Sequence, residues 1–239
     1  MAAQMQRAAM TALSTGARAW LARPPSAPGT GVVVLMEVFG LTPWLRGVCE
    51  RFARAGYLAV APDLYHGDEF GYDDRDAARA RSKLLEDDAA MRDVAAAIDL
   101  LTGEGARDDG IAVIGFCMGG RLAFLANATH GHRLAACVSL YGGSIAPATA
   151  TARRPLLDRV PDLVAPQLLI YGAKDASIAP DEHGRLAEAL TAANRRYTLA
   201  VLPDAGHGFA TEDRDSFDPE AAAAAWRIAF AFLVDALMH

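Results

Sequence analysis

The turn at residues 115–119 limits the possible folds of this chain more than any other feature. It reads Gly115-Phe116-Cys117-Met118-Gly119, between the apolar run 111–114 and a helical pattern that continues to about residue 128. A glycine–x–nucleophile–x–glycine turn holds a reactive side chain on a strained strand-to-helix corner, where neighbours without side chains avoid clashes. The helix that follows directs backbone N–H groups toward charge that develops beside the sulfur. The pattern predicts a buried strand, a raised nucleophile and a helix, in that order.

Short apolar runs alternate with helical patterns along the rest of the chain. The runs expected as strands are 31–36, 57–61, 111–116, 135–141, 167–172 and 197–202. The helical patterns are 44–55, 82–101, 118–129, 181–193 and 219–236. Continuous β-branched runs such as 31–36 are typical of strands covered on both faces, and the alternation predicts an α/β fold with a mostly parallel sheet. No repeat or domain linker is visible, so residues 1–239 are expected to form one domain; the segment 142–165 gives no assignment.

Composition excludes several classes of function. The net charge of −6 provides no basic footprint for nucleic acid, and the apolar runs are far shorter than the roughly 20 residues of a membrane helix. Residues 1–14 lack the sustained apolar core of a secretory signal. Cys49, Cys117 and Cys137 lack the paired spacing of a disulfide framework or a zinc site, which favours a reducing cytoplasm and no metal. The acidic run 68–76 is interpreted as a solvated segment.

Polar residues follow three of the expected strands in a telling order. Strand 111–116 leads into Cys117, strand 167–172 into Asp175, and strand 197–202 into a turn that contains His207. Nucleophile, acid and histidine occur in this chain order in α/β-hydrolases, and loops at the carboxyl ends of parallel strands converge on one crevice. His207 would take the thiol proton and later activate water, and Asp175 would hold the imidazole in one tautomer.

Each of these residues has a simpler interpretation when taken alone. A single cysteine is commonly a small buried hydrophobe, and glycine-rich turns with Asp or His are common surface turns. Three suitable residue types in the correct order at three strand ends favour the joint catalytic interpretation. Glu37 adds to it, because a carboxylate at the end of a buried strand is costly without a partner or a task. Glu37 could instead cap the helix near Pro43, but Thr42 is better placed for that.

Five motifs together resemble the dienelactone hydrolase family. They are 36–40 (MEVFG), 61–65 (APDLY), 115–120 (GFCMGG), Lys174-Asp175 and 206–209 (GHGF), and the resemblance extends from about residue 18 to the C-terminal helix. It implies an α/β-hydrolase fold, a Cys117-Asp175-His207 triad and no cofactor. It also implies that Glu37 contacts the thiol at rest and helps to deprotonate it. The backbone N–H groups of Val38 and Met118 would form the oxyanion hole. The family reaction is hydrolysis of an enol-lactone in chloroaromatic breakdown, which gives maleylacetate.

The chain departs from the family pattern where the substrate carboxylate would bind. The family has an arginine four residues after the histidine, and this chain has Thr211 there. Candidates for a second family arginine are Arg75, Arg79 and Arg81. The expected substrate-binding residues are Arg79 and Arg81, together with Phe39 and Phe209. Arg214 could compensate for the missing arginine, but it is interpreted as a solvated loop charge.

The nucleophile type narrows the expected substrate. A thiolate attacks well but also leaves well, so its attack on a plain alkyl ester tends to revert. The hypothesis is therefore a hydrolase for a small activated ester or enol-lactone, with no nucleic acid or membrane partner. A general carboxylesterase or thioesterase of the same fold remains an alternative. A catalytically idle relative that only binds a small ligand is the other.

Overall fold

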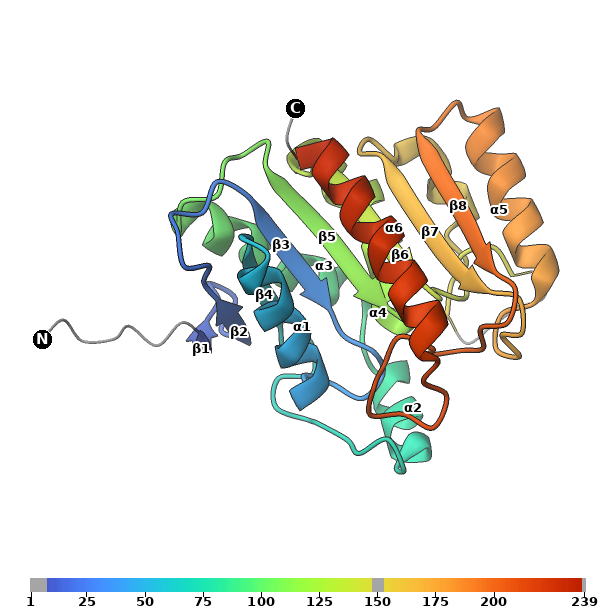
Figure 1. Ribbon diagram of the computed structural model, residues 1–239, viewed down its shortest axis with the longest axis horizontal. Helices are drawn as coiled ribbons and strands as arrows, with labels where there is room; N and C mark the ends of the chain where they lie inside the picture. Colours follow the sequence, from blue (N-terminus) through green and yellow to red (C-terminus); the bar gives the residue numbers. More distant parts are fainter. Residues whose placement is uncertain (1–7, 148–152, 238–239) are drawn as a thin grey trace, which may run out of the picture.

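One mixed sheet dominates the computed structural model, which describes residues 8–147 and 153–237. In this described part, the sheet has eight strands in the order β1-β2-β4-β3-β5-β6-β7-β8 (Figure 1). The bounds are β1 Ala8–Ala12, β2 Arg18–Ala22, β3 Gly31–Leu35, β4 Leu58–Pro62, β5 Ile111–Phe116, β6 Ala136–Leu140, β7 Gln167–Gly172 and β8 Tyr197–Leu202. Strands β3 to β8 run parallel to one another, whereas β1 and β2 pair antiparallel at one edge of the sheet.

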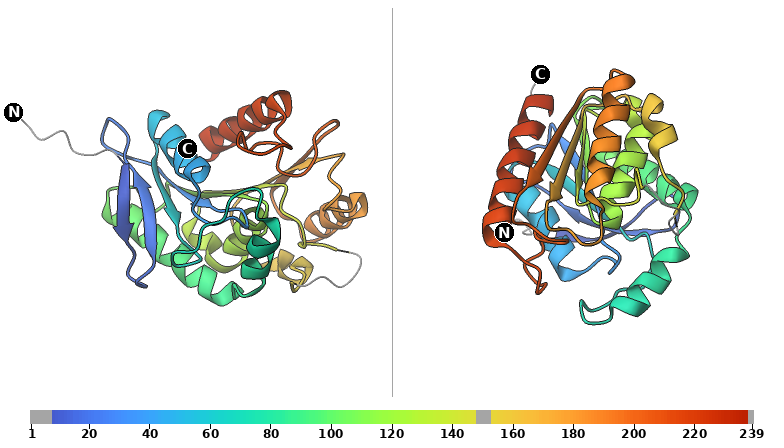
Figure 2. Two further views of the ribbon diagram at one scale, coloured as in Figure 1. Left: turned by 90° about the horizontal axis from the view of Figure 1, so that it is seen from below. Right: turned by 90° about the vertical axis from the view of Figure 1, so that its right-hand side faces the viewer.

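Helices cover both faces of this sheet, as Figure 2 shows. Helices α1 and α6 lie on one face, and α3, α4 and α5 lie on the other. The bounds are α1 Pro43–Arg54, α2 Arg75–Lys83, α3 Asp87–Gly103, α4 Met118–His130, α5 Pro180–Ala192 and α6 Pro219–Leu237, with short 3₁₀ helices η1 at Gly131–Arg133 and η2 at Leu157–Asp162. Every residue of β3, β5, β6 and β7 is buried, which explains their largely apolar sequences.

The N-terminal edge of the sheet was not expected from the sequence. Strands β1 and β2 form an antiparallel pair that joins β4 through β2. Residues 8–12 read AAMTA, which has neither the β-branched content nor the alternation that marks a strand. The first seven residues of the expected signal-free N-terminus, and residues 148–152 of the unassigned segment, lie outside the described residues.

The single helix expected over 82–101 is wrong, because the structure has two helices there. Helix α2 ends at Lys83 and α3 begins at Asp87, and Leu84 in the connection is largely exposed. The Ser82 hydroxyl donates to the Arg79 carbonyl, a local bond that competes with helix continuation. The break lets α2 extend back to Arg75, into the segment that was interpreted as solvated. This helix forms part of the wall of the cavity described below.

The carboxyl ends of the parallel strands meet at one edge of the sheet. Strands β5, β6, β7 and β8 are consecutive neighbours in register, for example Gly172 beside Leu202. The loops that follow β3, β5, β7 and β8 therefore open on the same side of the molecule, as open α/β sheets do at their binding crevices. No helix in the described residues is both long and apolar enough to cross a membrane.

Candidate active site

The turn after β5 has the strained geometry that its sequence predicts. Cys117 has φ 54° and ψ −117°, a conformation that L-residues rarely adopt. A Cβ atom at Gly115 would lie 1.9 Å from the Gly119 carbonyl oxygen, and one at Gly119 would lie 2.3 Å from the Leu35 oxygen. Both positions therefore need glycine, because the backbone passes too close for any side chain. The turn lifts the sulfur out of the sheet at the start of α4.

Cys117, His207 and Asp175 form one hydrogen-bonded chain. His207 Nε2 lies 3.1 Å from Cys117 Sγ, and His207 Nδ1 lies 2.8 Å from Asp175 Oδ2. The other Asp175 oxygen accepts the Ser177 N–H at 2.7 Å, and the aspartate side chain is fully buried. These bonds fix the carboxylate, and the carboxylate fixes the imidazole. The structure thus brings together the three residues that the sequence places at separate strand ends.

The charges in this chain favour a protonated imidazole. Burial of the ring lowers the pKa of His207, but the adjacent Cys117 sulfur and the hydrogen bond to Asp175 outweigh that cost. Together they raise the pKa from its ordinary 6.5 to about 10. The Tyr141 ring packs edge-on against the imidazole, with 5.3 Å between the two ring centroids. The geometry therefore suits an imidazolium beside the Cys117 sulfur.

Glu37 follows β3, but its hydrogen bonds go to residues other than the thiol. Its Oε1 accepts a hydrogen bond from Arg214 Nη1 at 2.8 Å, and its Oε2 accepts one from the Thr211 hydroxyl at 3.2 Å. Burial raises the pKa of Glu37, although the Arg214 charge acts in the opposite direction. The contact between Glu37 and the resting thiol implied by the family resemblance is therefore not the arrangement seen here.

Arg214 is not the solvated loop charge that the sequence suggested. Its side chain is only 9% exposed, because it pairs with Glu37 and lies over the Phe39 ring at 5.4 Å. The pairing with Glu37 raises the pKa of Arg214 despite its burial. An arginine seven residues after His207, instead of four, thus reaches the site in this chain. Thr211 faces the same carboxylate from the position where the family has its arginine.

Two backbone N–H groups border the sulfur. Val38 follows Glu37 in the loop after β3, and Met118 opens α4; both residues line the cavity beside Cys117. Neither N–H donates a hydrogen bond to another described residue. Two unpaired N–H donors near a nucleophile are the arrangement that stabilises an oxyanion.

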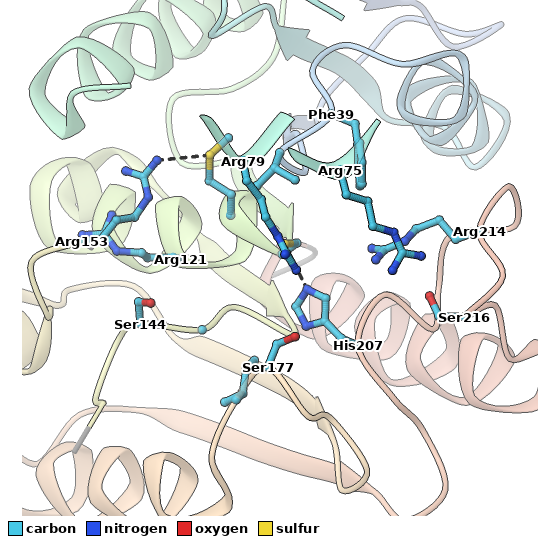
Figure 3. A pocket seen from close by; sticks show the side chains of 15 residues that line it. Phe39, Arg75, Arg79, Arg121, Ser144, Arg153, Ser177, His207, Arg214 and Ser216 are labelled. Atoms are coloured by element: carbon cyan, nitrogen blue, oxygen red, sulfur yellow. Dashed lines mark hydrogen bonds between the residues drawn. The ribbon is translucent and has the colours of Figure 1, made fainter. Parts of the chain in front are cut away.

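A cavity of about 350 Å³ opens over the sulfur (Figure 3). The residues that line it are Val38, Phe39, Arg75, Arg79, Cys117, Met118, Arg121, Gly143, Ser144, Arg153, Ser177, Ile178, His207, Arg214 and Ser216. Five of these are arginines and none is acidic, although the whole chain carries a net charge of −6. The cavity therefore favours anionic ligands.

Two of the four expected substrate-binding residues, Phe39 and Arg79, line this cavity. Arg81 does not, because its guanidinium binds the Asp68 carboxylate and the Tyr65 carbonyl, and stacks over the Tyr65 ring. Phe209 is fully buried behind the site, where it packs against Tyr141. The structure corrects both expectations, because each of these two side chains points away from the cavity.

Sequence reasoning missed several residues of the cavity. Arg75 was a candidate that was not chosen, although it lies four residues before the expected Arg79 on α2 and faces the same side, so that spacing was a usable signal. Arg121 lies one turn into α4 and Arg153 lies shortly before η2, so only the fold brings them to the site. In the described residues, no group of three His, Cys, Asp or Glu side chains is placed to hold a metal ion.

The fold and the site together define a class of protein. A mostly parallel sheet with helices on both faces, a strained Gly-x-Cys-x-Gly turn and a histidine–carboxylate pair at the strand ends are the features of an α/β-hydrolase.

The chain belongs to the dienelactone hydrolase family, whose model matches residues 17–237. It is 34% identical over 214 residues to the "Putative carboxymethylenebutenolidase" of Yersinia pestis, with 87% of this chain and 80% of the relative covered. A relative of the same name from Salmonella typhimurium is 34% identical over 217 residues, with 87% and 79% covered. The crystal structure of "Putative Dienelactone Hydrolase" from Klebsiella pneumoniae superposes with a TM-score of 0.87 at 34% identity, and covers 95% of this chain and 98% of its own. Members of this family hydrolyse ester and lactone bonds, and this chain is a hydrolase of that kind.

Proposed function

We propose that this protein hydrolyses a small activated ester or enol-lactone that carries a carboxylate, with Cys117 as nucleophile. The observation that carries the proposal is the hydrogen-bonded chain from the Cys117 sulfur through His207 to Asp175, at the strained turn. Its order and geometry match the nucleophile, base and orienting carboxylate of acyl-transfer enzymes.

The first half of the reaction forms a thioester. The Cys117 thiolate attacks the carbonyl carbon, and the carbonyl oxygen becomes an oxyanion that the Val38 and Met118 N–H groups stabilise. The intermediate collapses as the C–O bond to the leaving group breaks, and the His207 imidazolium gives its proton to the departing oxygen. The imidazole is then neutral and can act as a base.

The second half consumes water. His207 takes a proton from a water molecule as its oxygen attacks the thioester carbon. The C–S bond breaks and the acid is released. The protonated His207 then again lies beside the Cys117 thiolate. Asp175 stabilises the imidazolium in both halves, because its carboxylate accepts the Nδ1–H throughout.

Glu37 has a supporting place in this proposal. It is buried, and Arg214 and Thr211 hold its carboxylate on the loop that also carries Val38. This arrangement supports a role in fixing the position of the Val38 N–H.

The chemistry of the nucleophile and the cavity supports the substrate class. A thioester forms in useful amount only if the ester oxygen leaves as readily as sulfur, as enol and aryl oxygens do. The Arg79 side chain points toward His207 in Figure 3 and makes no hydrogen bond from its guanidinium to another described residue, so it can bind a substrate carboxylate beside Phe39. The three cysteines are unpaired, which suits a reducing cytoplasm.

Aryl and alkyl esters test this proposal directly. Steady-state hydrolysis of p-nitrophenyl acetate should be much faster than that of ethyl acetate. Cys117→Ala should abolish hydrolysis, and His207→Ala should reduce it by about a thousandfold or more, because the general base is lost. Cys137→Ala, at a buried cysteine outside the cavity, is the matched control. Equal rates on the two esters, or wild-type activity in Cys117→Ala, would contradict the proposal.

A further inference from the structure

Four of the five arginines of the cavity form two groups on either side of His207 (Figure 3). In Figure 3, Arg121 and Arg153 lie on one side of His207, and Arg75 and Arg214 lie on the other, with Arg79 between them. All five line the same cavity as Cys117. A substrate with one carboxylate would use only one of these groups.

In the group formed by Arg121 and Arg153, two guanidinium groups contact one carboxylate of the described residues, that of Asp87. Arg121 is only 2% exposed, and both of its terminal nitrogens bind the Asp87 carboxylate at 2.8 Å. Arg153 reaches the same carboxylate at 3.5 Å, so two guanidinium groups share Asp87. Burial lowers the pKa of Arg153, and the charge of Arg121 lowers it further.

Arg153 also donates hydrogen bonds to uncharged acceptors, which bind a guanidinium less strongly than a carboxylate does. Its Nη2 donates to the Ser82 carbonyl and, at 3.5 Å, to the sulfur of Met118. A thioether sulfur is a weak acceptor, whereas a carboxylate forms a charge-assisted bond with a guanidinium. Met118 and Cys117 line the same cavity, so a carboxylate at this position would share that cavity with the ester bond. The Nε of Arg121 is buried there without a hydrogen-bond partner in the described residues.

The opposite group has its own unused donors. The Nε of Arg214 and the Ser216 hydroxyl are buried and have no hydrogen-bond partner in the part of the chain that the structure describes. Arg75 and Arg79 place two like charges one helical turn apart, which costs stability unless an anion lies between them. Both sides of the sulfur are therefore built to receive an anion.

Building on the hydrolase function proposed above, we propose that the substrate is a dianion, with one carboxylate on each side of the ester bond that Cys117 attacks. Arg79, with Arg75, binds the first carboxylate. Arg153, backed by Arg121, binds the second in place of the Met118 sulfur. Loss of either carboxylate from the substrate therefore lowers kcat/KM, and a different arginine accounts for each of these two decreases.

Four aryl esters separate the two carboxylates. They are phenyl acetate, 4-acetoxybenzoate, phenyl hydrogen succinate and 4-(succinyloxy)benzoate, which carry no carboxylate, one on the leaving group, one on the acyl group, and both. Each kcat/KM is divided by the rate constant of hydroxide-catalysed hydrolysis of the same ester, to remove differences in intrinsic reactivity. For the wild type, each carboxylate should raise the ratio by at least about tenfold, and the dianion should show both gains.

Two variants assign the carboxylates to the two groups. Arg153→Gln should lose the gain from one carboxylate and keep the other, and Arg79→Gln should show the opposite pattern. Arg154→Gln is the matched control, because Arg154 is adjacent in sequence, 75% exposed and outside the cavity. Far-ultraviolet circular dichroism and urea unfolding that match the wild type show that each variant is folded, and Arg153→Lys should restore part of the lost gain.

The outcomes distinguish this inference from the function on which it rests. If the dianion is no better than the best monoanion, or if both variants remove the gain from the same carboxylate, the dianionic substrate is wrong while the hydrolase function stands. If Cys117→Ala still hydrolyses phenyl acetate, the hydrolase function itself is contradicted.

Discussion

Cys117 differs from the two other cysteines in its surroundings. Cys49 and Cys137 are fully buried, and that burial raises the pKa of both thiols. Cys117 instead lines the cavity and faces the protonated form of His207. Since only an accessible thiolate reacts readily with an alkylating agent, the three residues should differ sharply in reactivity.

Thiol labelling measures this difference. With iodoacetamide, Cys117 should be modified first, whereas Cys49 and Cys137 should react only when the chain opens. Peptide mapping by mass spectrometry after timed labelling gives the three rates. His207→Gln should slow labelling of Cys117 alone, because the imidazolium that stabilises the thiolate is gone. Similar rates at all three cysteines would indicate an idle site.

Individual residues were predictable where a motif fixes their backbone. Cys117, Asp175 and His207 each lie in the turn or loop that follows a strand, and the sheet forces strand ends together. Arg81 and Phe209 were mispredicted because the sequence does not say which way a side chain points. Arg214 was missed for a related reason: its partner Glu37 is 177 positions away, and only the fold reveals the pair.

At the scale of elements, the buried parallel strands were the most predictable part. Continuous apolar runs such as β5 and β7 can satisfy both covered faces only as central strands. The strand β1 and the break between α2 and α3 could not be predicted, because each depends on tertiary pairing or on one local hydrogen bond. The break matters for function, since it allows α2 to carry Arg75 and Arg79 to the cavity.

The junction of β5, β3 and α4 gives a test of element packing. Gly119→Ala should lower the free energy of unfolding by about 1–3 kcal/mol, because its Cβ would meet the backbone of Leu35 and Met36 at 2.3–2.7 Å. Gly184→Ala in α5 is the matched control, since no atom lies within 4 Å of its added Cβ.

The control should gain about 0.5–1 kcal/mol, the usual advantage of alanine over glycine inside a helix. Urea unfolding followed by circular dichroism gives both values. If Gly119→Ala were as stable as the wild type, the close approach of α4 to β3 would be wrong.

At the scale of the whole molecule, the pKa of His207 links the site to folding. The imidazole has an ordinary pKa of 6.5, and the folded protein raises it to about 10. The folded state therefore binds the proton more tightly than the unfolded chain. This stabilisation is fully present below pH 6.5 and is lost as the pH rises toward 10.

Unfolding at two pH values checks the sign of this effect. Between pH 6.5 and pH 10, the free energy of unfolding of the wild type should fall more steeply than that of His207→Gln. Because the Cys117 charge is the strongest influence that raises this pKa, the effect of His207→Gln should shrink in a Cys117→Ala background. An equal slope in wild type and His207→Gln would show that the imidazole is not held protonated.

The contacts of the site also set when activity can return during refolding. The bond between Cys117 and His207 joins residues 90 positions apart, and that between His207 and Asp175 joins residues 32 apart. Neither can form until β5 through β8 have aligned, since each side chain is held at the end of a different strand. Recovered turnover therefore reports the assembly of this half of the sheet, whereas recovered helical signal can precede it.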